Sequence, residues 1–302
     1  MTPEHGPTAD VVADVVRSAL GENTIPPVRP IGEGGEHSSW RIGTRHVARF
    51  ALDRDASARQ RREIALRDLV RPHVGIPLPR SVAVGEWAPG RTFTVDAAIP
   101  GASGEDQSVS TAGEADLARL LAGLRSVPVH AAAAVGVPAA EPPDVAALSR
   151  RAGTAADWLA AHGRFDVGLL PRLVPPALAA NGPAARVLVH NDLKGEHLRV
   201  TGDGRVCGVL DWTDAELGDP AADVAGLAIS VGAAAAVRVA SAAGYDSAVC
   251  VRGVHLARCG TVLLLADRLQ GRDDSPLALL RTQLERAWEV RGADARALGA
   301  GG

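Results

Sequence analysis

The sequence predicts an α+β fold of two lobes, a small N-terminal lobe with an antiparallel sheet and a larger, mostly helical C-terminal lobe. The chain has 302 residues, which is more than a single hydrophobic core usually serves. Residues 28–99 carry strand patterns around one helix pattern, whereas residues 111 onward are mostly helical in pattern. We therefore expect residues 1–100 to form the first lobe and residues 101–302 to form the second.

The elements of the first lobe follow from periodicity and glycine. Residues 8–21 place apolar side chains at helical spacing and end on Gly21, so they predict a helix. Short strand patterns broken by glycines fill residues 28–51, and a charged helix pattern follows over residues 53–70. Two further strands are predicted at residues 81–87 and 91–99. The order of three strands, one helix and two strands indicates an antiparallel sheet with a helix against it.

The second lobe contains one stretch that is not helical in pattern. Residues 187–212 read as short strands, and a Gly-Asp-Gly turn at residues 202–204 predicts a hairpin within them. Pro- and Ala-rich connections occupy residues 138–143 and 171–185. The most apolar stretch, residues 224–243, is rich in Ala, Gly and Val and contains Arg238. We interpret it as a buried helix and not as a membrane span.

Composition excludes several classes of protein. The formal net charge is −3 and hydrophobic residues make up 46% of the chain, so neither a basic excess for nucleic acid nor a disordered composition is present. The 3 cysteines show no paired spacing, which argues against a disulfide framework or a zinc site. The first residues show no secretion signal. We expect a cytoplasmic monomer that binds neither nucleic acid nor membrane.

Two aspartates flank the predicted hairpin. Asp192 lies in the loop that follows an apolar strand, and Asp211 ends the second hairpin strand. Because a hairpin returns the chain to its starting point, we expect Asp211 close to Asp192. One carboxylate of such a pair can accept the proton of an attacking hydroxyl. The other can hold a divalent metal that neutralises transferring phosphate oxygens.

The segments that carry these aspartates resemble the catalytic loop and metal-binding segment of the aminoglycoside phosphotransferase family of antibiotic kinases. That family shows His-Gly-Asp, four residues and Asn, then Ile-Asp-Trp and Gly-Asp-Pro-x-x-Asp. This chain has His-Asn-Asp-Leu-Lys-Gly-Glu-His at residues 190–197, Leu-Asp-Trp at 210–212 and Gly-Asp-Pro-Ala-Ala-Asp at 218–223. The resemblance implies a protein-kinase-like fold. It also implies Asp192 as catalytic base, Asp211 as metal ligand and His190 as a brace of the loop.

The resemblance also assigns residues in the first lobe. Glu63 stands where the family places the acid that pairs with a basic residue on the third strand, which here is Arg49. Arginine clamps phosphate oxygens with a fork instead of a point charge. Glycines let backbone N–H groups approach a polyphosphate, so the loop of residues 31–39 is the expected phosphate cover, with Gly34, Gly35 and Ser38 in contact. Ile99 marks the connection between the lobes, where backbone groups would read the nucleotide base.

Three positions depart from the family pattern. Asn191 replaces glycine, but asparagine tolerates left-handed backbone angles. Lys194, the only lysine among 32 basic residues, stands where protein kinases carry a lysine that touches the γ-phosphate, and we assign it that role. His197 replaces asparagine as the second metal-site residue, although Mg²⁺ prefers oxygen ligands. Histidine at this position resembles the macrolide 2′-phosphotransferase branch, whose members use GTP.

The function implied is transfer of the γ-phosphate of GTP, with Mg²⁺, to the 2′-hydroxyl of a macrolide amino sugar, which confers macrolide resistance. ATP as donor stays open. A slight excess of arginine over acid in residues 251–302 favours a macrolide over a polycationic aminoglycoside. The alternatives are another small-molecule kinase of this fold, a nucleotide-binding pseudokinase and a metal-binding module without catalysis.

Four further acids have structural explanations. Asp219 followed by Pro220 is the pattern of a helix start. Asp214, Glu216 and Asp223 face either a cationic substrate or, as we prefer for each, solvent or a structural partner.

Overall fold

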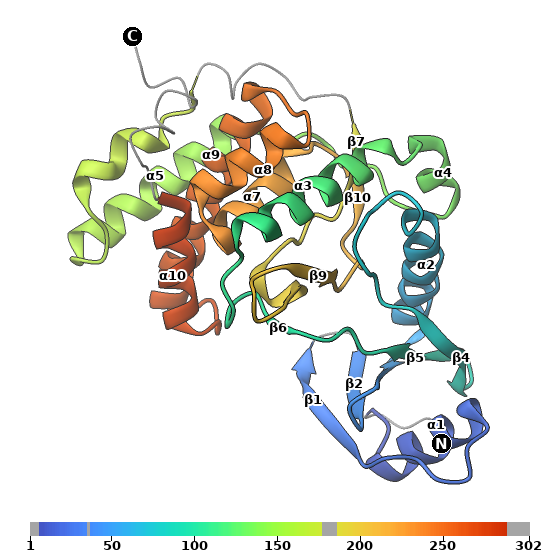
Figure 1. The fold of residues 1–302 in the computed structure, drawn as a ribbon. Coiled ribbons are helices and arrows are strands. Elements are labelled where there is room, and N and C mark those ends of the chain that lie inside the picture. Colours follow the sequence, from blue (N-terminus) through green and yellow to red (C-terminus); the bar gives the residue numbers. More distant parts are fainter. Residues whose placement is uncertain (1–5, 35–36, 177–185, 289–302) are drawn as a thin grey trace.

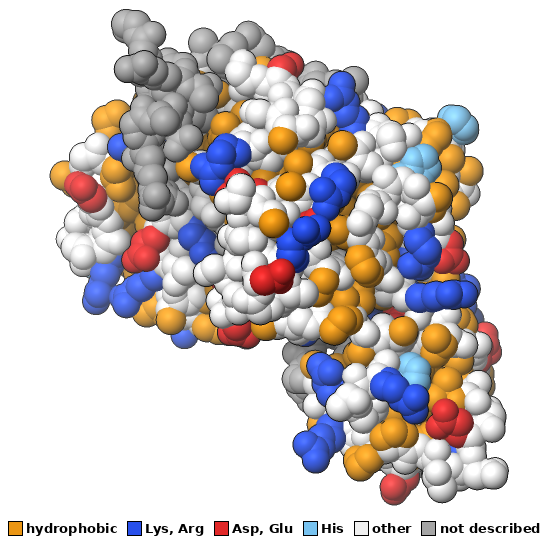
Figure 2. Space-filling model, in the orientation of Figure 1, with side chains coloured by type: hydrophobic (Ala, Val, Ile, Leu, Met, Phe, Trp, Pro, Cys, Tyr) orange, Lys and Arg blue, Asp and Glu red, His pale blue; other side chains and the backbone are white. Residues whose placement is uncertain are grey.

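The computed structural model describes residues 6–34, 37–176 and 186–288. A small lobe built on a sheet and a large lobe of helices are joined where the chain passes from β5 (Arg91–Ala97) to β6 (Ala102–Ser103) (Figure 1). The predicted α+β arrangement of two lobes is confirmed. On the face drawn in Figure 2, basic and acidic side chains are interspersed over both lobes.

The sheet of the small lobe has five strands in the order β1-β2-β3-β5-β4, all antiparallel. Its other strands are β1 (Val28–Gly34), β2 (His37–Ile42), β3 (His46–Ala51) and β4 (Ser81–Ala88). Two helices accompany it as predicted, α1 (Ala9–Leu20) before the sheet and α2 (Arg54–Val70) between β3 and β4. Gly21 ends α1 with a φ of 64°, a left-handed angle that glycine adopts without strain.

The two helices attach to different cores. Val12 and Val16 of α1 are fully buried in a cluster with Trp40 and Phe50 of the sheet. Helix α2 instead places Leu66 among the buried residues of the large lobe. Because α2 is anchored in the larger core and also lies against β3 and β5, it connects the sheet mechanically to the helical lobe.

The helices of the large lobe pack around α9 (Ser247–Leu269), which contacts α5, α7 and α10. The α-helices there are α3 (Thr111–Ser126), α4 (Val129–Ala134), α5 (Val145–Ala161), α7 (Ala221–Val231), α8 (Ala233–Ala242), α9 and α10 (Leu277–Trp288). Two 3₁₀ turns, η1 (Val167–Leu173) and η2 (Gly195–His197), complete the helical elements of the residues that the structure describes.

The expectation of one helix over residues 224–243 was wrong. Gly232 takes a φ of 96° and separates α7 from α8, because this backbone angle is open to glycine and cannot continue a right-handed helix. Among the described residues, α9 alone is long and apolar enough to cross a membrane by length and composition. That is weak support for a span, since 67% of its most apolar window is buried inside the protein.

Short strands within the large lobe bring two loops together. β8 (Leu198–Val200) and β9 (Val206–Val209) form the predicted antiparallel hairpin, and β6 pairs with β8. A second pair, which the sequence did not predict, joins β7 (Val187–Val189) to β10 (Glu216–Gly218). The loop that follows β7 and the segment that follows β9 therefore meet beside the junction of the lobes.

Candidate active site

His190 begins the loop after β7 and is completely buried. The backbone N–H of Asp192 donates to its Nδ1 at 3.3 Å, so its Nε2 carries the proton and donates to the Leu210 carbonyl at 3.0 Å. Burial, with the charge of His197, lowers the pKa of His190 to about 4, which keeps the ring neutral. The ring also lies edge-to-face against Trp212, with centroids 4.7 Å apart. His190 thus ties the loop to the end of β9.

The backbone of this loop is held by Asp223 of α7. Its carboxylate accepts the N–H of His190 at 3.0 Å and the N–H of Asn191 at 2.8 Å. Asn191 has a φ of 64°, the left-handed angle expected for the residue that replaces glycine. Burial raises the pKa of Asp223 to about 7, although the two N–H groups favour the ionised form. Asp223 therefore has a structural role, because it holds the backbone of the loop. The Gly-Asp-Pro-x-x-Asp pattern in the sequence marks its position.

Two nitrogen-bearing side chains of its own loop, Lys194 and His197, lie beside the carboxylate of Asp192. The Nζ atom of Lys194 lies 3.1 Å from Oδ1, and the Nδ1 atom of His197 lies 3.3 Å from Oδ2. Burial raises the pKa of Asp192, and the attraction of Lys194 and His197 opposes that rise only in part. A carboxylate with a raised pKa accepts a proton more readily near neutral pH.

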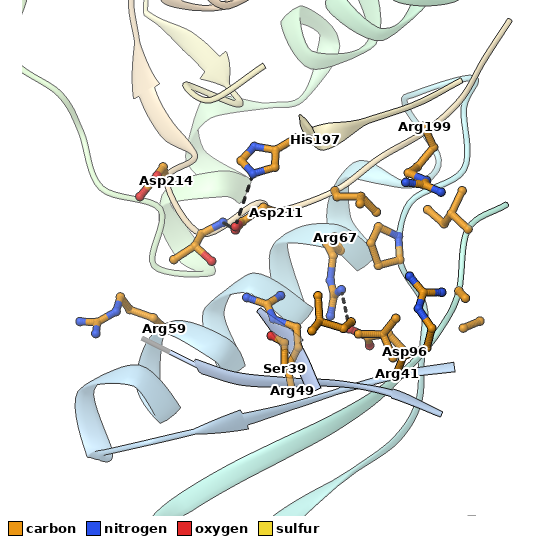
Figure 3. Close-up of a pocket in the computed structure, with 18 of the residues that line it drawn as sticks. Ser39, Arg41, Arg49, Arg59, Arg67, Asp96, His197, Arg199, Asp211 and Asp214 are labelled. Carbon is orange, nitrogen blue, oxygen red and sulfur yellow. Dashed lines mark hydrogen bonds and ion pairs between the residues drawn. The ribbon is translucent and has the colours of Figure 1, made fainter. Parts of the chain in front are cut away.

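Asp211 follows β9 and points into the space beneath the small lobe (Figure 3). Its φ is 53°, an uncommon angle for aspartate that the sequence did not indicate. Burial favours the neutral acid, but the attraction of Arg49 and His197 and a hydrogen bond from Thr213 outweigh it, so the pKa of Asp211 is lowered. Its carboxylate is ionised and 45% exposed.

The imidazole of His197 lies between the two aspartates, which the hairpin was expected to bring close together. Nδ1 of His197 donates to the Asp192 carbonyl at 2.9 Å, and Nε2 lies 3.9 Å from Oδ2 of Asp211. The hairpin has therefore brought Asp211 next to the loop that holds Asp192, with His197 between them.

A divalent metal fits this site through Asp211. Mg²⁺ usually takes one or two protein carboxylates and completes its shell with water and substrate phosphates, and Asp211 offers an ionised, half-exposed carboxylate. Within the described ranges, no group of three or more His, Cys, Asp or Glu is arranged to hold a metal ion. Nδ1 of His197 is already committed to Asp192, so only Nε2 faces the Asp211 side.

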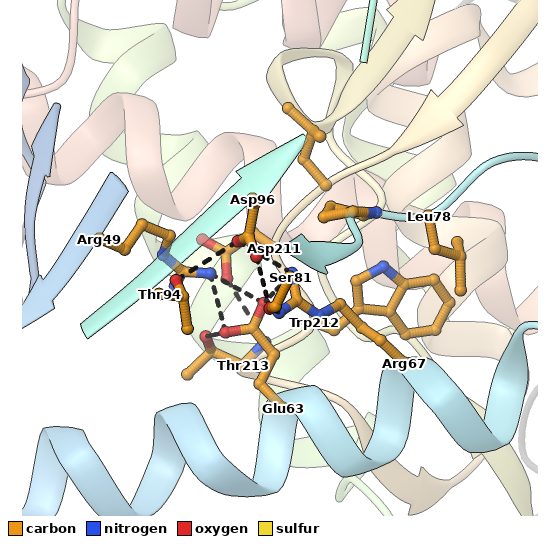
Figure 4. Close-up of polar contacts among 12 residues, drawn as sticks. Arg49, Glu63, Arg67, Leu78, Ser81, Thr94, Asp96, Asp211, Trp212 and Thr213 are labelled. Carbon is orange, nitrogen blue, oxygen red and sulfur yellow. Dashed lines mark hydrogen bonds and ion pairs between the residues drawn. The ribbon is translucent and has the colours of Figure 1, made fainter. Parts of the chain in front are cut away.

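An ion pair lies in the same cluster of polar contacts as Asp211, as Figure 4 shows. Arg49 of β3 donates to both carboxylate oxygens of Glu63 of α2, at 2.8 Å each. Glu63 is 1% exposed and Arg49 is 16% exposed, so the pair expected from the sequence forms in a largely dry setting. Burial would raise the pKa of Glu63, but Arg49 and Arg67 together lower it.

The same cluster connects α2 to the segment after Asp211. The hydroxyl of Thr213 donates to Glu63 at 3.4 Å, and the guanidinium of Arg62 donates to the Thr213 carbonyl at 3.0 Å. On the other side, Arg67 donates to Asp96 of β5 at 3.2 Å. The position of Arg49 is therefore set jointly by the sheet, by α2 and by the loop that carries Asp211.

A cavity of about 750 Å³ lies between the lobes. Strands of the sheet form one wall, and the hairpin with the segment around Asp211 forms the other (Figure 3). Six arginines line it, together with Asp211, His197 and Ile99; they are Arg41, Arg49, Arg59, Arg62, Arg67 and Arg199. Arginine forks bind phosphate oxygens in bidentate fashion, so the cavity suits an elongated polyanion that reaches Asp211.

A profile described as the phosphotransferase enzyme family matches residues 27–257, which is more than half of the chain. The chain belongs to this phosphotransferase family. The matched range contains both aspartates, the ion pair between Arg49 and Glu63, and the cavity between the lobes.

Two relatives of known sequence match this chain, one at low identity over most of its length and one at higher identity over a short segment. Viomycin phosphotransferase of Streptomyces vinaceus is 28% identical over 225 residues, which cover 68% of this chain and 74% of that protein. The uncharacterized protein YcbJ of Bacillus subtilis is 46% identical over 41 residues, which are 14% of this chain and only 13% of that protein.

Solved structures share the fold over nearly the whole chain. Aminoglycoside 2′-phosphotransferase-IIIa in its GDP complex matches with a TM-score of 0.68 at 19% identity, covering 93% of this chain and 98% of that one. Macrolide 2′-phosphotransferase from Brachybacterium faecium matches with a TM-score of 0.61 at 20% identity, covering 93% and 99%. The kinase-like fold expected from the sequence is confirmed.

In this phosphotransferase, some expected residues lie away from the cavity. Ser38 was expected to contact phosphate, but its hydroxyl accepts the indole N–H of Trp40 at 2.7 Å on the opposite face of β2. Side chains alternate along a strand, so the neighbouring Ser39 lines the cavity instead. Gly34 ends β1, and Gly35 lies outside the described residues.

Lys194 of the phosphotransferase site also differs from its expected contact. Its ammonium group lies between Asp192, at 3.1 Å, and Glu196, at 3.4 Å, and the side chain is 38% exposed. A contact of Lys194 with the γ-phosphate stays a prediction. Asp219, expected at a helix start, accepts the N–H of Ala221 at 3.0 Å and forms a buried ion pair with Arg252.

Proposed function

We propose that this phosphotransferase moves the γ-phosphate of GTP onto the 2′-hydroxyl of the amino sugar of a macrolide antibiotic. The observation that carries the proposal is the pair Asp192 and Asp211, held on either side of His197 beside an arginine-lined cavity. Phosphoryl transfer needs little covalent chemistry from a protein, because positioning and charge stabilisation supply most of the acceleration. The site offers both.

Each residue has a role in this scheme. Asp192, with its raised pKa, accepts the proton of the attacking hydroxyl, while His190 fixes the loop that presents it. Arg49, anchored by Glu63, donates hydrogen bonds to phosphate oxygens. Asp211, with His197 beside it, would hold Mg²⁺, which when bound neutralises charge on the transferring phosphate.

The macrolide and the donor are inferred from the loop and from the relatives. Histidine at position 197 is the feature that resembles the macrolide branch, and a macrolide 2′-phosphotransferase is among the structures that share the fold. GDP is bound in the solved aminoglycoside 2′-phosphotransferase-IIIa complex, which supports a guanine nucleotide as donor.

A second candidate acceptor is a cationic antibiotic such as an aminoglycoside. Asp214 lines the cavity, and burial together with the charge of Asp214 raises the pKa of Glu216. Acidic side chains near the transfer site favour a positively charged acceptor. Viomycin phosphotransferase matches over two thirds of this chain, which also keeps non-macrolide acceptors in consideration. A pseudokinase is less favoured, since Asp192 and Asp211 are both present and ordered.

The deciding experiment measures nucleoside-diphosphate release from GTP and from ATP, with Mg²⁺ and with erythromycin, kanamycin or viomycin as acceptor. Asp192→Asn is the matched control, because it keeps the shape of the side chain and removes the base. Release that requires erythromycin and is lost in the control supports the proposal. Release that requires kanamycin or viomycin replaces the macrolide by that acceptor. Nucleotide binding without any acceptor-dependent release favours the pseudokinase.

We further propose that the protein is a cytoplasmic monomer whose lobes divide at residues 100 and 101. The three cysteines, Cys207, Cys250 and Cys259, are all free thiols, which suits a reducing compartment. Light scattering of the purified protein coupled to size exclusion tests the monomer, and an elution mass of twice the chain contradicts it.

A further inference from the structure

Arg199 lies at the end of the cavity that is remote from the aspartates. It belongs to β8 and pairs in register with Gly208 of β9. The side chain of Ile99 covers Gly208 so closely that a Cβ atom there would meet it at 2.5 Å. Arg199 is therefore next to the segment that joins the lobes, and both Arg199 and Ile99 line the cavity.

Arg41 of the small lobe reaches the same end. In the pairing of β2 with β3, Ser39 stands opposite Arg49, and Arg41 stands opposite Val47. Two residues along a strand span about 6.6 Å, so Arg41 is one step farther than Ser39 from the ion pair of Arg49. Figure 3 shows Arg41 and Arg199 together at one end of the cavity, with Asp211, Asp214 and Arg59 toward the other.

One nitrogen of the Arg199 guanidinium has no hydrogen-bond acceptor among the described residues. Its Nε atom is buried and makes no hydrogen bond to any part of the chain that the structure describes. A buried donor without an acceptor is costly and rare in folded proteins, and Arg199 lines the cavity, so a ligand bound there is a source of acceptors for its guanidinium. Because a guanidinium has donors and no acceptor, the ligand atoms that Arg199 meets are hydrogen-bond acceptors.

The order of the residues along the cavity indicates which part of a nucleotide lies beside Arg199. With the γ-phosphate at Asp192 and Asp211 and the phosphate chain at Arg49, the base reaches the end marked by Ile99, Arg41 and Arg199. Guanine presents two acceptors, O6 and N7, on one edge, which match an arginine fork. Adenine presents N7 beside an amino group, which is a donor and meets the guanidinium unfavourably.

We propose that Arg199, with Arg41 beside it, reads the O6 and N7 edge of guanine and makes this enzyme select GTP over ATP. The proposal rests on the proposed function, because it requires a nucleotide in this cavity. It assigns base selection to a side chain of β8, in addition to the backbone groups near Ile99.

The first test needs no substitution. Calorimetry with Mg²⁺ measures the dissociation constants of GDP, IDP, ADP and 7-deaza-GDP for the wild-type protein. IDP keeps O6 and N7 but lacks the 2-amino group, so it binds within about threefold of GDP if this edge is read. ADP and 7-deaza-GDP bind more weakly than GDP, by about 5- to 150-fold for ADP. Equal binding of ADP and GDP, or IDP binding as weakly as ADP, overturns the proposal.

The second test substitutes the arginine. Arg199→Met lowers the ratio of GDP to ADP affinity by about fivefold or more, and Arg199→Lys, which keeps the charge without the fork, gives an intermediate ratio. Arg150→Met, at an exposed position of α5, is the matched control and leaves the ratio unchanged. Thermal unfolding of each variant shows whether it is folded.

The outcomes separate the two proposals. A ratio that Arg199→Met leaves unchanged in a folded protein overturns the assignment of Arg199 while leaving nucleotide binding in place. If the wild-type protein binds none of the four nucleotides, the proposed function fails and base selection fails with it.

Discussion

The imidazole of His197 donates a hydrogen bond to the backbone carbonyl of Asp192, at 2.9 Å, from the far end of the same loop. This bond fixes which nitrogen carries the proton and turns Nε2 toward Asp211, 3.9 Å away. An asparagine side chain is shorter than imidazole and has one amide group in place of two ring nitrogens. Histidine therefore spans the distance between the two aspartates in this chain.

We expect His197→Ala to lower kcat by about 10- to 100-fold, the usual effect of removing a group that orients a metal ligand. The substitution leaves the backbone at Asp192 and Asp211 unchanged, but it removes the imidazole that lies between their side chains. His197→Asn should recover part of kcat, since its amide still donates to the Asp192 carbonyl. Steady-state kinetics at saturating nucleotide measure the effect. Equal kcat for His197→Ala and the wild type would show that His197 only fills space.

Removing the charge of Glu63 should destabilise the junction of the lobes. Glu63→Gln leaves Arg49 without its buried counter-charge, while Arg67 keeps Asp96. Breaking a buried ion pair by changing one partner costs about 3 kcal/mol in the free energy of unfolding. The KM for the nucleotide should rise as well, because Arg49 loses the acceptor that positions it over the cavity.

Chemical denaturation and the nucleotide KM test this expectation. Glu22→Gln is the matched control, since Glu22 is exposed beyond α1 and its substitution should change stability by less than about 0.5 kcal/mol. If both variants unfold at the same denaturant concentration, the ion pair of Glu63 contributes nothing measurable.

The sequence predicted the conformation of the loop of residues 190–197 well, because its residue types and its local geometry agree. Asp192, Asp211 and the hairpin between them follow from turn residues and spacing, and Asn191 takes the left-handed angle that its position requires. Arg49 and Glu63 were paired correctly through the resemblance, since their contact spans the sheet and a helix and no local pattern encodes it.

The sequence did not predict the contacts of side chains whose direction depends on the register of a strand, or whose partners are distant along the chain. Ser38 and Ser39 are adjacent and chemically alike, and only the burial of Trp40 under α1 determines which of them faces the cavity. For Asp223 the sequence left solvent and a structural partner both open, because its partners are backbone N–H groups of a loop more than thirty residues earlier. Nothing in the sequence singled out Arg199, because the role proposed for it depends on its place in the cavity and on a nitrogen without an acceptor.

Asp223 should make stability depend on pH. Burial raises its pKa to about 7 in the folded protein, whereas in the unfolded chain it titrates near its ordinary value of about 3.9. The folded state therefore holds a proton that the unfolded state has released. The stability from this group is complete below the unfolded pKa and is lost as pH rises through about 7, with a slope of up to about 1.4 kcal/mol per pH unit.

Urea unfolding at pH 5, 6, 7 and 8 compares the wild type with Asp223→Asn. The variant lacks the titrating group, so its free energy of unfolding should fall less steeply with pH, whatever constant offset the lost hydrogen bond causes. Parallel curves would mean that Asp223 stays ionised over this range, held by the two N–H groups of the loop.

Lys194 should act on the chemical step more than on binding. Its ammonium group lies 3.1 Å from Asp192, where it either holds the base in place or moves onto the γ-phosphate when the nucleotide is bound. In both cases Lys194→Met should lower kcat, by about tenfold or more for the loss of one charged contact in the transition state, with little change in the KM for the acceptor. The pH dependence of kcat separates the two roles, because the charge of Lys194 lowers the pKa of Asp192. An acidic limb of kcat that moves to higher pH in Lys194→Met supports the contact with Asp192, and an acidic limb that stays in place supports a contact with the γ-phosphate. A kcat unchanged in Lys194→Met would leave Lys194 with no part in transfer and make its pairing with Asp192 a surface ion pair.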